Sequence, residues 1–150
     1  MTDTSAETLD RRPLKSREKR VFQRMADALV RANVSPNAIS VFGMIAGVAS
    51  GATLYATSHT EGVAVRLLWL MSAALVQLRL LCNMLDGMVA IGSGKQSKLG
   101  ELYNELPDRV SDSFTLIGVG YALGGHPTLG WCGALLAMAT AYVRAVGKAA

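Results

Sequence analysis

Aromatic residues and cysteines are both scarce in this chain. Aromatic residues make up only 6% of its 150 residues, whereas glycine and alanine are common. This composition suits helices that pack closely in lipid better than it suits the aromatic core of a soluble domain. The two cysteines, Cys82 and Cys132, lie in separate apolar segments. Their spacing excludes a disulfide framework and a cysteine metal motif, so we expect both to be small packing residues.

Residues 1–34 contain no long apolar stretch, so we expect no cleavable signal peptide there. Residues 1–13 are polar, charged and without periodicity, so we predict a disordered tail. Residues 14–33 predict an amphipathic helix, with apolar side chains on one face and lysines and arginines around the rest. We expect this helix to lie on an anionic membrane surface rather than in a soluble bundle, because a long apolar segment follows it.

Charge is almost absent from several later segments. Hydrophobic residues make up 51% of the chain and its mean hydropathy is +0.30, too apolar for an ordinary soluble domain of this size. Four segments predict membrane-spanning helices: 38–57, 63–82, 109–123 and 128–146. The predicted fold class is therefore all-α: a polytopic membrane bundle of four transmembrane helices, preceded by an amphipathic interfacial helix. Residues 14–150 are expected to form this single membrane domain.

Lysine and arginine are missing from two of the predicted turns, at 58–62 and 124–127. Basic residues gather instead in the amino-terminal segment, in a loop at 92–99 and at the end of the chain. With four spans, all three basic regions face the cytosol. We therefore expect a multi-pass integral membrane protein, of the bacterial inner membrane, whose polar site lies at the cytosolic face.

Glycine and proline carry three further expectations. Glycine repeats every four residues along the first span, at Gly43, Gly47 and Gly51, which we interpret as a smooth surface for close helix packing. Gly87 lies beside Asp86 and would let a ligand approach the backbone closely. Pro107 suits the first turn of a helix and would be disruptive deeper in one.

Acidic and amide side chains recur at helical spacing on two consecutive helices. Asn83 and Asp86 are three residues apart at the end of the second span, and Arg79 lies four residues before Asn83 on the same face. Asn104 and Asp108 are four residues apart on the next helix. Such groups are costly at a membrane boundary. They favour a hard divalent cation bound with a phosphate; the alternative is helix capping with solvated interfacial charge.

A fixed pattern of small and polar residues connects these positions: Asn83, Asp86, Gly87, Ala90, Ile91, Gly100, Asn104 and Asp108. Its spacing resembles the signature of the CDP-alcohol phosphatidyltransferase family. That signature runs Asp, two residues, Asp-Gly, two residues, Ala-Arg, about eight residues, Gly, three residues, Asp, three residues, Asp. Pro36 and Asn37, ahead of the first span, also look like the family's usual entry. Members usually have six transmembrane helices, more than the four predicted here.

The resemblance implies the transfer of a phosphatidyl-type group from a CDP-alcohol to a second alcohol, with release of CMP. It implies a metal site, for Mg²⁺ or Mn²⁺ bridging the diphosphate, made by Asn83, Asp86, Asn104 and Asp108. It also implies that Asp108 is the general base for the acceptor hydroxyl, in line with the chemistry of carboxylates near a metal. The small residues that match positions where the cytidine packs are Gly87, Ala90 and Gly100.

The chain departs from the signature at three positions. Asparagine stands in place of aspartate at 83 and 104, and Ile91 stands in place of arginine. An asparagine offers a metal its carbonyl oxygen without a charge. We therefore expect lower metal affinity unless another nearby carboxylate compensates, the candidates being Glu101, Glu105 and Asp112.

Two arginines are candidate substrate-binding residues. Arg79 shares a helix face with Asp86 and would supply the positive charge that is missing at 91; the alternative is an arginine that reaches to the membrane interface. Arg144 is a candidate ligand for an acceptor phosphate, because a guanidinium binds phosphate oxygens in a fork. Its alternative role is a cytosolic anchor.

These features predict an enzyme: a metal-dependent membrane transferase of phospholipid biosynthesis. Its donor is a CDP-alcohol lipid such as CDP-diacylglycerol, its acceptor an alcohol that the sequence does not name. The alternatives are a catalytically degenerate member that binds CDP-lipid and a prenyl-diphosphate transferase, whose motif fits less well. The resemblance implies a homodimer among membrane lipids, with no nucleic-acid partner. The short length indicates either a fragment or a short member completed by another subunit.

Overall fold

The computed structural model describes residues 20–94 and 98–149, and every regular element in these ranges is a helix. The elements are α1 (Arg20–Arg31), α2 (Pro36–Ala56), the short 3-10 helix η1 (Thr57–His59), α3 (Val63–Gly92), α4 (Lys98–Tyr121) and α5 (Pro127–Ala149). The predicted all-α fold is confirmed. The predicted tail at 1–13 and the start of the predicted amphipathic helix, at 14–19, lie outside the described residues.

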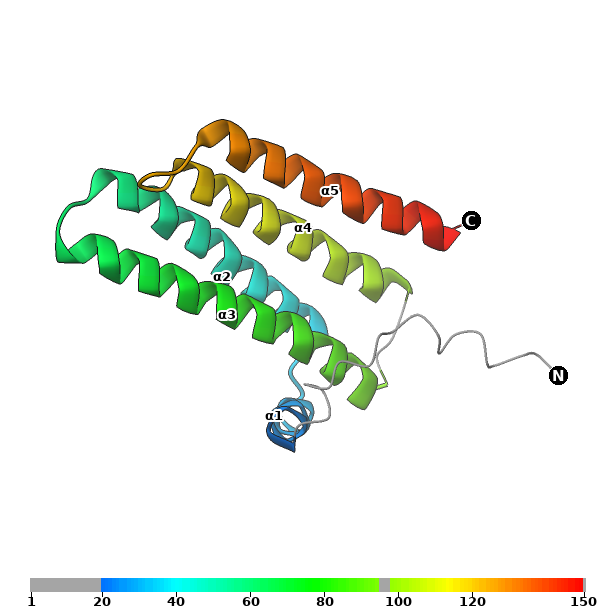
Figure 1. Ribbon diagram of the computed structural model, residues 1–150. Helices are drawn as coiled ribbons and strands as arrows, with labels where there is room; N and C mark the ends of the chain where they lie inside the picture. Colours follow the sequence, from blue (N-terminus) through cyan, green and yellow to red (C-terminus); the bar gives the residue numbers. More distant parts are fainter. Residues whose placement is uncertain (1–19, 95–97, 150) are drawn as a thin grey trace.

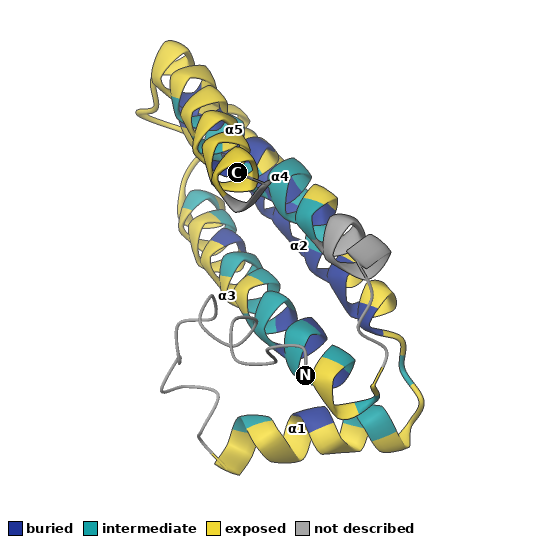
Figure 2. Cartoon of the chain, turned by 90° about the vertical axis from the view of Figure 1, so that its right-hand side faces the viewer, coloured by how far each residue is buried: buried dark blue, intermediate teal, exposed yellow. Residues whose placement is uncertain are grey.

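Four long helices lie side by side, and α1 lies across one end of them (Figure 1; Figure 2). Helix α2 packs against both α3 and α4, α4 also packs against α5, and α1 packs against α3. The order across the bundle is therefore α3, α2, α4, α5. The end of α3, the start of α4 and the end of α5 lie at the same end of the bundle as α1, and the two short turns lie at the other.

Three helical segments in the described part of the chain are long and apolar enough to cross a membrane: Pro36–His59, Val63–Gly92 and Pro127–Gly147. By length and composition the chain is thus an integral membrane protein. The predicted span at 109–123 is not among the three, because α4 includes charged residues such as Asp108, Arg109 and Asp112. Helix α4 nevertheless lies between α2 and α5 (Figure 1), so four crossings stay a prediction.

Helix α3 begins at Val63, as predicted, but the end of α3 and the start of α4 differ from the predicted bounds. Helix α3 continues to Gly92, so Asn83 and Asp86 lie inside it, and α4 already begins at Lys98, within the predicted loop. Pro107 lies in the interior of α4, contrary to the expected place in a first turn. It cannot donate a hydrogen bond to the preceding turn, but a helix held between neighbouring helices tolerates that loss.

The glycines of α2 allow α4 to approach it closely, as the sequence predicted. A Cβ atom at Gly47 would overlap the side chain of Ser111, and one at Gly51 would overlap the backbone at Phe114. Gly43 instead faces Cys82 of α3, which is buried as expected of a packing residue. Cys132 is exposed on α5, so its expected role as a packing residue stays a prediction. Helix α5 packs mainly against α4, and most of its described side chains are exposed.

Helix α1 turns its apolar side toward the bundle and its arginines away from it. Ala26 is buried and belongs to a core cluster with residues of α2 and α3, such as Ile39 and Val89. The arginines of this helix are exposed, namely Arg20, Arg24 and Arg31. This packing closes the end of the bundle beside the polar residues of α3.

Candidate functional site

The polar residues of the predicted site come from α3 and α4, which both pack against α2 but have few close backbone contacts with each other. Long polar side chains of α3 and α4 nevertheless contact each other. Helix α3 contributes Arg79, Asn83 and Asp86, and helix α4 contributes Asp108 and Asp112. The two halves of the signature therefore meet in space, although they are about 25 residues apart.

Asp86 is a buried carboxylate, with 4% of its surface exposed. The hydroxyl of Ser40, which is also buried, donates a hydrogen bond of 2.6 Å to Oδ2 of Asp86. The backbone N–H of Gly87 donates one of 2.6 Å to Oδ1. Because both oxygens accept hydrogen bonds, the carboxylate is held in one orientation between α2 and α3. Burial of a charged group is tolerated when it is bonded in this way.

Asp108 is joined to α3 by two side chains. Nδ2 of Asn83 donates to Oδ2 of Asp108 at 3.0 Å, and Nη2 of Arg79 lies 3.3 Å from Oδ1. Arg79 also makes a 2.8 Å ion pair with Asp112 and donates from Nε to Ser111 at 2.9 Å. One guanidinium thus holds two carboxylates and a hydroxyl of α4, which fixes that face of α4 relative to α3.

Charge in the described part of the site is partly balanced. Arg79 lies between Asp108 and Asp112, and Arg109 approaches Asp112 at 3.8 Å. Burial raises the pKa of Asp108, which precedes the predicted span, above the usual range for aspartate, and the charge of Asp112 raises it further. The charges of Arg79 and Arg109 and the hydrogen bond from Asn83 oppose this shift. A raised pKa suits a carboxylate that accepts a proton during a reaction.

For the other predicted site residues, the structure gives fewer contacts. Gly87 and Ala90 are half-buried on α3 beyond Asp86. Gly100 and Asn104 belong to α4, but their side-chain positions lie outside what the structure describes. Arg144 is exposed on α5. Arg79 contacts α4, whereas the sequence predicted a role beside Asp86.

Two serines of the site, Ser40 and Ser111, were not predicted from the sequence. Ser40 was counted as part of an apolar span, although it lies on the same helix face as Gly43 and Gly47. Ser111 is three residues after Asp108 and accepts the hydrogen bond from Arg79. Helical spacing to a known site residue is the signal that would have found Ser111. No spacing connects Ser40 to Asp86, because the two lie on different helices.

The site contains oxygen ligands of the type that a hard cation prefers. Asp86 and Asp108 are carboxylates and Asn83 offers a carbonyl oxygen, which are the ligands that Mg²⁺ and Mn²⁺ prefer. A carboxylate oxygen that accepts one hydrogen bond keeps a second lone pair for a metal. Among the described residues, however, no three His, Cys, Asp or Glu side chains lie together as a metal site. The predicted ligand Asn104 is outside that test.

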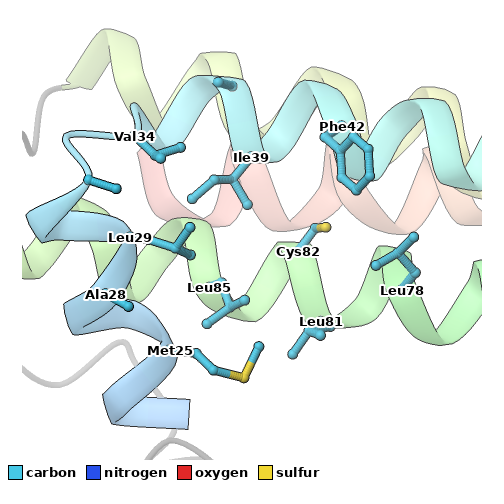
Figure 3. Close-up of a pocket in the computed structure, with 12 residues that line it drawn as sticks. Met25, Ala28, Leu29, Val34, Ile39, Phe42, Leu78, Leu81, Cys82 and Leu85 are labelled. Atoms are coloured by element: carbon cyan, nitrogen blue, oxygen red, sulfur yellow. The ribbon is translucent and has the colours of Figure 1, made fainter.

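An apolar groove lies between α1, α2 and α3 (Figure 3). Its volume is about 670 Å³. The groove is lined by Ile39 and Leu85, which precede Ser40 and Asp86 in the sequence; neither Ser40 nor Asp86 is part of its lining. Its walls are almost entirely aliphatic, with contributions from Met25, Leu29, Val34, Phe42, Leu78 and Leu81.

The chain is similar to proteins of known function. Two curated relatives are each named phosphatidylinositol phosphate synthase. The one from Mycobacteroides abscessus is 31% identical over 118 residues, which are 77% of this chain and 47% of the relative. The one from Cutibacterium acnes is 34% identical over 134 residues, which are 84% of this chain and 59% of the relative. The chain thus spans about half the length of these relatives.

No solved structure matches the chain significantly. The family model of the CDP-alcohol phosphatidyltransferases matches residues 33–148, which include all of α2 and α3, the described part of α4 and nearly all of α5. The matched region contains every residue of the signature, from Asn83 to Asp108. Because the match extends over most of its length, the chain belongs to the CDP-alcohol phosphatidyltransferase family, a family of transferases.

Proposed function

We propose that this protein transfers a phosphatidyl group from a CDP-alcohol lipid to an acceptor alcohol, with release of CMP. The observation that carries the proposal is the hydrogen bond between Asn83 of α3 and Asp108 of α4. It joins the two halves of the family signature in one polar site at the end of an apolar bundle. A reaction between a lipid donor and a water-soluble acceptor needs such a boundary.

The apolar groove supports a donor with acyl chains, such as CDP-diacylglycerol. It is open and apolar, and its lining includes Leu85, the residue that precedes Asp86 (Figure 3). Acyl chains that enter it would leave the polar end of the lipid beside the buried carboxylate. Burial of aliphatic surface would then contribute to donor binding, at about 25 cal/mol per Å².

Asp108 is proposed as the general base. Its carboxylate takes the proton of the acceptor hydroxyl while the acceptor oxygen forms a bond to the lipid-bearing phosphorus. The bond from that phosphorus to the bridging oxygen breaks, and CMP leaves with the bonding electrons. Asn83 and Arg79, which contact separate oxygens of Asp108, hold the carboxylate in place. Positioned proton transfer of this kind contributes roughly 10²–10⁴-fold to a rate.

A divalent cation is part of the proposal, as Mg²⁺ or Mn²⁺. The residues that would hold it are Asn83, Asp86, Asn104 and Asp108. When bound, such a cation neutralises negative charge on a diphosphate and on departing CMP. Gly87, Ala90 and Gly100 would leave room for the cytidine end of the donor.

The proposed ligands for phosphate oxygens are Arg79 and Arg144. Arg79 already contacts the α4 carboxylates, so it lies within the site. The names of the two relatives lead us to propose an inositol phosphate as the acceptor, which would make the product a phosphatidylinositol phosphate. A phosphorylated acceptor would give Arg144 a partner, because arginine forms bidentate contacts with phosphate.

The arrangement in the membrane completes the proposal. We propose four crossings, with α1 on the membrane surface and the site at the cytosolic face of a bacterial inner membrane. A homodimer stays a prediction from the family.

The test is CMP release from CDP-diacylglycerol by the detergent-purified protein. The assay varies Mg²⁺ and Mn²⁺ and uses a panel of acceptors: inositol phosphate, glycerol phosphate, inositol and serine. Asp86→Ala and Asp108→Asn each remove a carboxylate of the site. Asp27→Asn removes an exposed carboxylate of α1 and is the control. We expect metal-dependent release that one acceptor stimulates, that both site variants abolish and that Asp27→Asn preserves.

Release that does not differ between the wild type and the site variants would contradict the proposal. Binding of CDP-diacylglycerol without release would identify the degenerate lipid-binding protein, and Asn83 and Asn104 would be the first residues to restore to aspartate.

A further inference from the structure

A buried serine hydroxyl of α2 contacts the site carboxylate Asp86 of α3. Ser40 lies in the second turn of α2, where it is 6% exposed, and its Oγ is 2.6 Å from Oδ2 of Asp86. The same Oγ is 3.2 Å from the carbonyl oxygen of Pro36. A serine hydroxyl has one proton to donate. The shorter distance and the charged acceptor favour donation to Asp86.

The segment that carries Ser40 has a fixed start. The side chain of Ser35 caps α2 by accepting a hydrogen bond from the N–H of Ala38, and Pro36 lies in the first turn. Such a start fixes the direction of the helix and leaves little freedom for its first turns. Ser40 therefore presents its hydroxyl from a rigid support.

We propose that Ser40 is a positioning residue that orients Asp86 toward the bound cation and diphosphate. The inference rests on the proposed function. With Gly87 on Oδ1 and Ser40 on Oδ2, the carboxylate cannot rotate without losing a hydrogen bond. Without the hydroxyl, Oδ2 loses a charge-assisted donor inside an apolar bundle. Asp86 would then populate other orientations, and cation binding would weaken.

The chain has a matched control for this proposal. Ser50 and Ser72 form a second buried hydroxyl contact between the same two helices, 2.8 Å long and nearly three turns of α2 away from Ser40. Ser50→Ala removes a buried interhelical hydrogen bond without touching Asp86. A merely structural role for Ser40 predicts the same behaviour for Ser40→Ala and Ser50→Ala.

The experiment compares the wild type with Ser40→Ala, Ser40→Cys, Ser40→Thr and Ser50→Ala in detergent. One readout is the Mg²⁺ concentration that gives half-maximal CMP release. The other is Mn²⁺ binding in the presence of CMP, measured by electron paramagnetic resonance. We expect Ser40→Ala to weaken both by roughly tenfold or more, as for the loss of a hydrogen bond to a charged group. Ser40→Thr keeps the hydroxyl and is expected to stay within about threefold, and Ser50→Ala within about twofold.

Equal behaviour of Ser40→Ala and Ser50→Ala in both readouts would overturn the proposal. If Ser40→Ala does not fold, Ser40→Cys decides, because a thiol keeps the volume of the side chain but is a weak donor. If the wild type releases no CMP, the proposed function fails and Mn²⁺ binding alone decides the role of Ser40. A wild type that binds no Mn²⁺ with CMP overturns both.

Discussion

At the scale of residues, the site depends on how carboxylates are held between apolar helices. Asp86 receives donors from α2 and from its own backbone, whereas Asp108 receives donors from α3. An unpaired charge in such surroundings would be strongly unfavourable. The two aspartates that the chain keeps from the family signature are thus oriented by different neighbours.

Arg79 provides the first residue-scale prediction. Its guanidinium group contacts Asp108, Asp112 and Ser111 at the same time, which a lysine cannot reproduce. We expect Arg79→Lys to raise the KM for CDP-diacylglycerol and to lower kcat, each by roughly tenfold, as for lost hydrogen bonds to charged groups. Steady-state kinetics measure both constants. Arg66→Lys, exposed near the other end of α3, is the control; an Arg79→Lys enzyme as active as that control would refute the assigned role.

Asn83→Asp is the second prediction at this scale. The change replaces the Nδ2 donor that lies 3.0 Å from Asp108 with a carboxylate oxygen, so two negative charges face each other. Like charges this close are destabilising, and a divalent cation relieves the repulsion. We expect a lower melting temperature than the wild type in EDTA and a larger rise on addition of Mn²⁺. Differential scanning fluorimetry measures both, with the exposed Asn37→Asp as control. A variant that Mn²⁺ stabilises no more than the wild type would argue against a cation at this place.

The sequence predicts the site only as far as helical spacing reaches. Spacing predicts that Asn83 shares a helix face with Asp86, and Asn104 with Asp108, but it does not predict how the two helices meet. The contact from Ser40 to Asp86 does not follow, because the register between α2 and α3 depends on how their side chains pack. The turn of Arg79 toward α4 has the same cause.

At the scale of elements, apolar length is a poor guide to where helices end. The span predicted at 63–82 is the apolar part of α3, but the helix continues through Gly92. A helix can continue past its apolar part when its polar side chains are hydrogen-bonded. Asn83 bonds to Asp108 of α4, and Asp86 accepts a hydrogen bond from Ser40 of α2. Helix α4 likewise continues through Pro107. The predicted glycine surface of α2 was right, since close packing needs only small residues on one face.

Gly51 gives the element-scale prediction. A side chain there would overlap the backbone of α4 at Phe114, while its neighbour Ala52 is exposed. We expect Gly51→Leu to separate α2 from α4 and to cost about 1–3 kcal/mol of stability or more. Ala52→Leu should leave stability within about 0.5 kcal/mol. Thermal unfolding in detergent compares the two. Equal melting temperatures would contradict the close α2–α4 contact.

At the scale of the whole molecule, the two ends of the bundle differ in chemistry. The arginines of α1 lie at the end that holds the site. At the other end, the rings of Tyr55 and His59 lie 4.8 Å apart, and Trp131 donates a hydrogen bond to the hydroxyl of Tyr121. Aromatic rings favour the membrane interface, and basic residues favour the cytosolic side. The asymmetry supports the proposed orientation.

Chemical labelling in whole cells tests that orientation. In a chain without its own cysteines (Cys82→Ala and Cys132→Ala), single cysteines are placed at the exposed positions Ser58 and Gln23. We expect a membrane-impermeant maleimide to label Ser58→Cys in intact cells, because the proposed orientation puts the turn after α2 on the outer side. Gln23→Cys on α1 should react only after permeabilisation. The reverse pattern would place the site on the outer face.

The most direct test of the central claim follows the acceptor into the lipid. Radiolabelled inositol phosphate and CDP-diacylglycerol are incubated with the purified wild type and with Asp108→Asn, and the lipid extract is counted. The account predicts labelled phosphatidylinositol phosphate from the wild type, in amounts equal to the CMP released, and at least roughly 10²-fold less from the variant. Equal labelling by the two proteins would contradict the assignment of Asp108 as the base, and labelled lipid from neither would contradict the proposed reaction with this acceptor.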